Sequence, residues 1–427
     1  MSIAATVTDP GVTGSSVKSW KAPIGFGFGA LLALFVFAIG GPATTAVFRV
    51  SDDSDRFRLA DIALPANVVG WVVALALIAI AVYSFLQVRR GDRINRWAGI
   101  AYAVLFVVGF LTWVVGIADR PSISLAGLVA GSVTLAIPLI FGSLSGVLCE
   151  RVGVVNIAIE GQLLSGAFAA AVAASISGSA YVGLLAAAFA GVLVSLILAI
   201  FSIKYLVNQI IVGVVLNVLV SGLTGFLAST LLSRDSATFN SPPGLPEVRI
   251  PLLADIPVIG PILFQQTIVG YLMYVAVIVI WLGLFRTRWG LRVRAVGEHP
   301  QAADTMGIKV NATRFWNVLL GGAVAGFGGA FFTLVSVSTF TRDMTAGQGY
   351  IALAALIFGR WNPIGAFFAA LLFGFATNLR FVLSIIGTDV PSQFLAMLPY
   401  IVTILAVAGL VGRSRPPAAG GIPYVKE

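Results

Sequence analysis

Charged side chains are scarce in this 427-residue chain: they make up 10% of it, against roughly 25% in an ordinary soluble domain. Hydrophobic residues make up 59% and fall in long blocks that a water-soluble core does not explain. At about 20 residues per crossing, such a chain can span a bilayer roughly ten times. This composition excludes a soluble enzyme, a nucleic-acid-binding protein and a secreted scaffold.

Cysteine and histidine occur once each, as Cys149 and His299. A single cysteine excludes an intramolecular disulfide, and a single histidine excludes a multi-histidine metal site. No lysine follows a glycine, so the Gly-Lys-Ser/Thr sequence of a phosphate-binding P-loop is absent, as is an HExxH motif. We therefore expect no catalytic residue, no metal site and no cofactor bound by this chain.

Basic residues outnumber acidic ones, 26 to 17, for a formal net charge of +9. Short Arg-rich loops stay on the cytoplasmic side of a membrane protein, so the positive balance favours a topological role over an acidic partner. The densest clusters are RRGDRINR at 89–96 and the loop 286–314, and both are predicted to be cytoplasmic. The polar first 20 residues do not resemble a cleavable signal peptide. Both termini are predicted to be cytoplasmic.

Eleven apolar stretches are predicted to cross the membrane. They are 24–41, 67–88, 97–118, 125–148, 163–180, 181–203, 209–232, 267–285, 315–338, 350–379 and 394–411. Eleven crossings would put the two termini on opposite sides, whereas both are predicted to be cytoplasmic. The conflict lies in the stretch 350–389, which Arg360, Asn362 and Pro363 interrupt: it forms one span plus a half-helix, or two short spans. The predicted fold class is all-α: a polytopic membrane protein with about 10–12 transmembrane helices and broken or re-entrant elements.

Small residues recur every fourth position in the span 315–338. Gly322 with Gly326, and Ala325 with Gly329, have the small-xxx-small spacing. Such pairs let the backbones of two membrane helices approach closely. We therefore expect this span to pack tightly against other helices.

The segment ERVGVVNIAIEG at 150–161 is too polar for a lipid-facing helix, although it lies between two apolar spans. Polar backbone and side chains survive at membrane depth only where protein or a water-filled cavity covers them, and ionisable groups there are usually functional. The segment is either a broken helix near a translocation path or an ordinary cytoplasmic loop with Glu150 and Arg151 in water.

Three other polar residues stand out in apolar surroundings. Asn217 lies inside an apolar span, nine residues after Asn208. It either makes an interhelical hydrogen bond or lines a path. Arg360 either lies at the membrane interface, with its charged end in water, or contributes to a path.

The loop 287–316 is too long to be a mere connector between adjacent spans. It contains a predicted short helix at 300–306, with Pro300 in its first turn and Gly307 as its C-terminal stop. An ordered short helix between spans is a natural docking element for a soluble partner. The alternative is a basic loop that only sets topology.

Two stretches carry a resemblance to a known family. IPLIFGSLSGVLCERVGVVNIAIEGQLLSGAF at 137–168 closely resembles the signature of ABC-importer permeases for simple sugars and nucleosides, within the branched-chain amino acid/ribose-type permease superfamily. GLRVRAVGEHPQAADTMGI at 290–308 resembles the inside loop of the same family. Ala302 and Ala303 followed by Gly307 also have the spacing of the coupling loop of importer permeases generally, although Gln301 replaces its Glu and the downstream Leu-Pro is missing.

The resemblance implies a permease subunit of an ATP-driven ABC importer, which translocates nucleosides or simple sugars by alternating access. A separate cytoplasmic ATPase subunit would hydrolyse ATP, and a second, related but different permease would complete the pathway. An extracytoplasmic substrate-binding protein or lipoprotein would deliver the substrate, and no nucleic acid is involved. The implied location is the bacterial cytoplasmic membrane.

The expected organisation has four parts. Residues 1–23 form a cytoplasmic tail, 24–124 an accessory membrane segment of three spans, 125–411 the permease core and 412–427 a second cytoplasmic tail. The resemblance covers only the permease core, so the three additional spans are an accessory bundle or an assembly surface.

The candidate site residues fall into two groups. Those of the ATPase-coupling loop are Glu298, Pro300, Ala302, Ala303 and Gly307; those of the substrate path are Asn156, Glu160, Asn208 and Asn217. Amide and carboxylate acceptors suit a neutral polyhydroxylated substrate. The alternative function is a self-sufficient secondary transporter or channel, which would need ion-coupling residues within the spans, and these are sparse.

Overall fold

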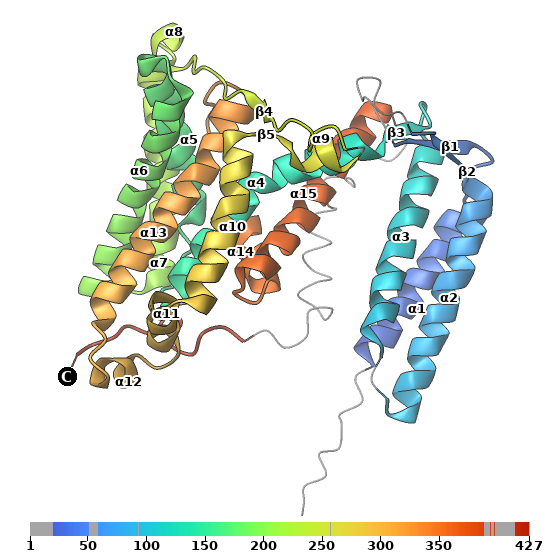
Figure 1. Ribbon diagram of the computed structural model, residues 1–427, viewed down its shortest axis with the longest axis horizontal. Helices are drawn as coiled ribbons and strands as arrows, with labels where there is room; N and C mark the ends of the chain where they lie inside the picture. Colours follow the sequence, from blue (N-terminus) through green and yellow to red (C-terminus); the bar gives the residue numbers. More distant parts are fainter. Residues whose placement is uncertain are drawn as a thin grey trace, which may run out of the picture. The chain divides into compact units, whose positions relative to one another are not determined.

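The computed structural model describes residues 20–50, 59–92, 94–256, 258–387 and 415–426, together with Gln393 and Met397 (Figure 1). Contacts divide the chain into two compact units. Unit 1 comprises Met1–Val47 with Ala63–Ser122, and unit 2 comprises Phe48–Ile62 with Ile123–Glu427.

Three membrane-length helices make up most of the first unit. They are α1 (Lys21–Ala33), which continues as the π-helical turns η1 (Leu34–Ile39), then α2 (Ala66–Arg90) and α3 (Arg96–Gly116). Phe37 is fully buried between them, with its ring 5.4 Å from that of Phe106 and 6.2 Å from that of Trp113. Strands β1 (Thr45–Arg49), β2 (Ile62–Pro65) and β3 (Ser122–Ser124) pair in the order β2-β1-β3.

Seven longer helices make up the bundle of the second unit. They are α4 (Leu125–Glu150), α5 (Ile159–Ser177), α6 (Ala180–Ala199) with η2 (Ile200–Lys204), α7 (Gln209–Leu227) with η3 (Ala228–Leu232), α10 (Ile268–Arg286), α13 (Val310–Phe331) with η4 (Phe332–Ser336), and α15 (Pro363–Ile386). Within the described ranges of both units, ten helices are long and apolar enough to cross a membrane. This number agrees with the prediction of 10–12 spans, and the all-α polytopic fold class is confirmed.

Short elements gather at the two ends of this bundle (Figure 1). One end carries α8 (Ser236–Phe239) and the antiparallel pair of β4 (Glu247–Arg249) and β5 (Gln265–Thr267), with α9 (Ile259–Leu263) between these strands in sequence. The opposite end carries α11 (Arg288–Glu298) and α12 (Pro300–Thr305). Residues 415–426 lie at this second end, beside α11.

Helix α13 lies at the centre of the bundle and packs against α4, α5 and α6. At Gly322 a Cβ atom would overlap the carbonyl oxygen of Gly191 on α6, and at Gly326 it would overlap that of Ala187. The close approach expected from the small-xxx-small spacing is therefore confirmed. A larger side chain at either position would push the two helices apart.

The ambiguous stretch 350–389 forms one span plus a half-helix. Helix α14 (Gln348–Phe358) has 11 residues, about 17 Å of helix, and cannot cross a hydrocarbon core of about 30 Å. Helix α15 then makes a full-length span after a tight turn at Arg360 and Trp361, which both have positive φ. The predicted span 394–411 lies outside the described residues, apart from Met397.

Candidate functional site

Helix α4 and helix α5 are separated by a non-helical segment, residues 151–158. Val152, Val154 and Asn156 in this segment are fully buried, so it is a break inside the bundle and not a loop in water. Because backbone groups in such a place need partners within the protein, side chains of α7 supply them. The N–H of Val155 donates to Gln209 Oε1 at 2.7 Å.

Asn217 on α7 holds both sides of the break. Its Nδ2 donates to the carbonyl of Ile157 at 2.9 Å, and its Oδ1 accepts from the N–H of Gly161 at 2.8 Å. The same Nδ2 donates to the hydroxyl of Tyr350 on α14 at 3.1 Å. Asn217 therefore makes the interhelical hydrogen bonds that were one of its two expected roles, and it joins α5, α7 and α14 at one point.

Glu160 lies at the start of α5 and caps the start of α14. Its Oε1 accepts from Thr345 Oγ1 at 2.6 Å and from the N–H of Gly347 at 2.8 Å, and its Oε2 accepts from the N–H of Gly349 at 2.6 Å. A carboxylate at a helix N-terminus also interacts favourably with the helix dipole. The two helix starts are in direct contact, because a Cβ at Gly349 would overlap the backbone of Glu160.

Polar side chains continue along one face of α7 from Asn217. Ser221, one helical turn further on, donates to Asp343 Oδ1 at 2.6 Å, and the hydroxyl of Tyr350 accepts from Asn217 Nδ2. We call Asn217, Ser221, Asp343 and Tyr350 the polar stripe. Three of its members, Ser221, Asp343 and Tyr350, were not predicted from the sequence. The spacing of Ser221 four residues after Asn217 was a usable signal, since such residues share a helix face.

The other two predicted path residues lie elsewhere. Asn156 is fully buried and donates to Gln162 Oε1 at 3.1 Å and to Ser145 Oγ at 3.2 Å. Gln162 in turn donates to Ser195 Oγ at 2.7 Å, so this network joins α4, α5 and α6. Asn208 is an exposed N-cap that accepts from the N–H of Ile210 at 2.9 Å. The structure brings Glu160 and Asn217 to the same junction but not Asn208.

Glu150 and Arg151, at the end of α4, form hydrogen bonds to the turn between α14 and α15. Arg151 Nε donates to the carbonyl of Trp361 at 2.8 Å, and the indole N–H of Trp361 donates to a carboxylate oxygen of Glu150. Burial lowers the pKa of Arg151, and the nearby Glu298 carboxylate acts in the opposite direction. Arg360 itself is exposed and contributes a main-chain carbonyl to this contact.

The short helix expected at 300–306 is present as α12. Pro300 is in its first turn, Ala303 is buried against the bundle, and Gly307 follows with a φ of 79° that favours glycine. Glu298, Ala302 and Gly307 are exposed. Met306, which was not predicted as a site residue, is 81% exposed. The helix thus presents Ala302, with Met306 and Gly307 directly after it, at the end of the bundle, and carries one partly exposed charge, Asp304.

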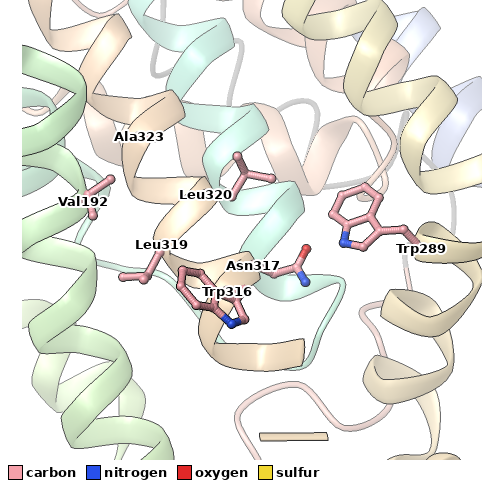
Figure 2. A pocket seen from close by; sticks show the side chains of 7 residues that line it. All are labelled: Val192, Trp289, Trp316, Asn317, Leu319, Leu320 and Ala323. Carbon is pink, nitrogen blue, oxygen red and sulfur yellow. The ribbon is translucent and has the colours of Figure 1, made fainter. Parts of the chain in front are cut away.

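A cavity of about 440 Å³ lies between α6, α11 and α13 and is separate from the polar stripe. Figure 2 shows Val192 and Trp289 on opposite sides of it, with Trp316 and Asn317 between them. The remaining lining is Leu319, Leu320 and Ala323. Because this lining is almost entirely apolar, it does not suit a polyhydroxylated solute.

Metal-binding side chains do not come together in the described ranges: no group of three or more His, Cys, Asp or Glu residues is found there. Cys149 is a buried free thiol on α4. It lies within the Asn156 network, as Asn156 Nδ2 donates to its Sγ at 3.5 Å. His299 is exposed between α11 and α12.

Asn217 also yields a prediction about stability. Replacement by alanine leaves the N–H of Gly161 and the carbonyl of Ile157 without their partner. A buried unsatisfied group costs about 1–3 kcal/mol, so we expect Asn217→Ala to lower the thermal midpoint of the detergent-purified protein by several degrees. Asn311→Ala, at an exposed position of α13, is the control. Equal midpoints for the two variants would contradict the bridging role of Asn217.

In the part of the chain that the structure describes, ten apolar helices, a buried break between two of them and an exposed short helix at one end define a polytopic membrane protein. Residues 128–407 match the family described as branched-chain amino acid transport system / permease component. The chain belongs to this family. It is a membrane-spanning permease subunit of an ABC transporter and not an enzyme.

Three curated relatives illustrate the similarity. The chain is 42% identical to the guanosine ABC transporter permease protein NupQ of Bacillus subtilis over 308 residues, which cover 70% of this chain and 96% of that protein. It is 42% identical to the nucleoside ABC transporter permease protein NupC of Lactococcus lactis over 309 residues, 70% and 97% of the two chains. A second guanosine permease protein of B. subtilis, NupP, is 27% identical over 247 residues, 56% of this chain and 69% of that one. No solved structure matches the chain.

Proposed function

We propose that this permease imports nucleosides and that the polar stripe lines their path. The observation that carries the substrate class is the 42% identity over nearly the whole length of two permeases named for guanosine or nucleoside transport. The stripe supplies the matching chemistry. The exposed Asp343 provides acceptors for ribose hydroxyls, and the half-exposed ring of Tyr350, whose hydroxyl accepts a hydrogen bond from the buried Asn217, provides a surface on which a base can stack.

Simple sugars are the competing substrate class. A sugar would use the same hydroxyl acceptors but would leave the Tyr350 ring without a flat aromatic partner. A nucleoside therefore uses more of the stripe than a sugar does. This difference supports nucleosides and makes Tyr350 the residue whose loss should weaken nucleoside uptake most selectively.

A separate ATPase subunit is proposed to dock on α12. The exposed Ala302, Met306 and Gly307 would make the contact, with Glu298 at its edge, while Pro300 and the buried Ala303 would hold the helix in place. ATP would be bound and hydrolysed by the partner, with no cofactor held by this chain. The end of the bundle with α11 and α12, and both termini, would then be cytoplasmic.

A series of contacts links α12 to the polar stripe. Helix α12 continues from α11, and the approach of Gly297 at the end of α11 to the carbonyl of Arg151 is so close that a Cβ would overlap it. Arg151 donates a hydrogen bond to the carbonyl of Trp361 in the α14–α15 turn. At the start of α14, the N–H of Gly349 donates to the carboxylate of Glu160. A displacement of α12 would thus be carried to the site by packed and hydrogen-bonded groups, which suits alternating access.

Two further partners and an accessory segment complete the proposal. Because B. subtilis has both NupQ and NupP as guanosine permease proteins, we propose a second, different permease subunit beside this chain. A substrate-binding protein or lipoprotein would deliver the nucleoside to the opposite end, in a bacterial cytoplasmic membrane. The helices α1, α2 and α3 precede the family match at residue 128, which supports their role as an accessory membrane segment.

The test begins with a mild-detergent pull-down of the tagged chain from its native membrane. We expect an ATPase with a P-loop and a second permease to be recovered. The purified complex, reconstituted in proteoliposomes with its binding protein, should import labelled guanosine and other nucleosides only with ATP, and a tenfold excess of ribose or glucose should not compete. Uptake of sugars alone would overturn the substrate class. ATP-independent transport by the isolated chain would instead establish a secondary transporter.

A further inference from the structure

Residues 415–426 pack as an ordered segment against the end of the bundle that carries α11 and α12; we call them the C-terminal strap (Figure 1). Tyr424 is 8% exposed and belongs to the main apolar core, and Pro417 and Ala419 are also buried. The sequence marks this stretch only as a short tail beyond the last span. Its burial is therefore a feature that the fold creates.

The strap contacts the proposed coupling loop at three points. The N–H of Ala419 donates to the carbonyl of Gly297 at 2.9 Å, and the N–H of Ala418 donates to Glu298 Oε2 at 3.3 Å. Lys426 Nζ lies 3.5 Å from Asp304 Oδ1 on α12. The exposed ion pair contributes little by itself, so the main-chain bonds and the buried ring of Tyr424 fix the strap.

The strap also contacts the break between α4 and α5. The N–H of Gly421 donates to the carbonyl of Gly153 at 3.2 Å. Gly153 has a φ of 84°, and a Cβ there would lie 2.9 Å from the carbonyl oxygen of Ala419. A single short segment therefore contacts the end of α11 on one side and the break on the other.

Arg314 on α13 is a buried cation that donates a hydrogen bond to the strap, so removal of the strap would change its surroundings. Arg314 is 2% exposed, and its Nη1 donates to the carbonyl of Ile422 at 3.0 Å. Its Nε and Nη2 have no hydrogen-bond partner among the described residues. Because a buried charge without partners is costly, loss of the strap would leave this cation without the strap's carbonyl and would favour rearrangement around α13.

We propose that the C-terminal strap couples the docking helix to the α4–α5 break, with Tyr424 and Arg314 as positioning residues. The strap adds a second connection beside the direct contact of Gly297 with Arg151. Movement that an ATPase imposes on α11 and α12 is passed through the strap to Gly153. Without the strap, the complex hydrolyses ATP but imports little substrate. This inference rests on the proposed function of the chain as an ATP-driven importer.

The experiment uses the full complex reconstituted in proteoliposomes with its binding protein. It compares wild type, a deletion of residues 415–427, Tyr424→Ala and the matched control Val425→Ala, whose side chain is 64% exposed beside Tyr424. Recovery of the ATPase with the tagged permease measures assembly. The decisive quantity is the number of substrate molecules imported per ATP hydrolysed, which a purely structural role would leave unchanged in complexes that assemble.

We expect the deletion and Tyr424→Ala to assemble and hydrolyse ATP, with import per ATP at least fivefold below that of Val425→Ala. Unchanged import per ATP in both variants would overturn the proposal, and so would loss of assembly in both, which would assign the strap a purely structural role. If only the deletion variant fails to assemble, the number of substrate molecules imported per ATP by Tyr424→Ala tests the proposal in the same way. A wild-type complex without ATP-dependent uptake would refute the proposed function itself.

Discussion

Glu160→Ala is expected to reduce ATP-driven uptake at least tenfold while the chain still copurifies with its ATPase. The substitution removes the acceptor of three hydrogen bonds, from Thr345 and from the N–H groups of Gly347 and Gly349. Each unsatisfied buried donor costs about 1–3 kcal/mol, and about 1.4 kcal/mol corresponds to a tenfold change in an equilibrium constant. Helix α14 should therefore lose its fixed start, whereas α12 at the end of the bundle keeps its contacts.

Two variants serve as references for this result. Glu160→Gln keeps the volume and one acceptor oxygen but turns a second donor toward the N–H of Gly349 or Gly347, so its uptake should be intermediate. Glu247→Ala, at an exposed position of β4, should retain normal uptake. Wild-type kinetics for Glu160→Ala would mean that the junction of α5 and α14 does not govern transport.

Deletion of residues 300–306 is expected to abolish uptake and ATPase recovery while the chain still inserts in the membrane. The deletion removes α12 together with the exposed Met306. Met306→Arg places a charge in the proposed contact, where an unpaired buried charge costs several kcal/mol, so ATPase recovery should fall more than tenfold. Gly307→Arg should act similarly, since φ is 79° at that position.

Met306→Leu is the matched control for the docking helix, because it conserves volume and adds no charge. Its ATPase recovery and uptake should stay within about twofold of wild type. Thermal stability of the detergent-purified variants should be similar, since the side chain at this position contacts mainly solvent. Normal uptake by Met306→Arg together with the deletion variant would remove α12 from the coupling route.

Hydrophobic patterning predicted most of the helices, with shifts of several residues at their ends. One such shift concerns α13, which begins at Val310 instead of 315. Its first turns contain Asn311, Thr313 and Arg314, polar residues that hydropathy places in a loop. The structure buries Arg314 because the strap offers it a carbonyl acceptor. A contact between residues 108 positions apart has no periodic signature in the sequence.

The candidate site was predicted in part. Glu160 and Asn217 were selected because polar side chains are conspicuous in apolar stretches, and the structure brings both to the junction of α5, α7 and α14. The same reasoning could not separate Asn217 from Asn208, as both are asparagines near an apolar run. Their difference is one of position: Asn208 caps the helix, and Asn217 lies about 13 Å further along it, opposite the break.

The sequence by itself determined the membrane class, because hydrophobic transfer depends on composition and run length, which need no tertiary information. It also determined the family, through the blocks at 137–168 and 290–308, and the short helix at 300–306, whose proline and glycine act locally. Only the tertiary structure decided which polar groups meet. Glu160 finds its partners at residues 345–349, and the strap finds Gly153 and Gly297. These pairings follow from how the helices pack, which is a property of the whole bundle and not of any one segment.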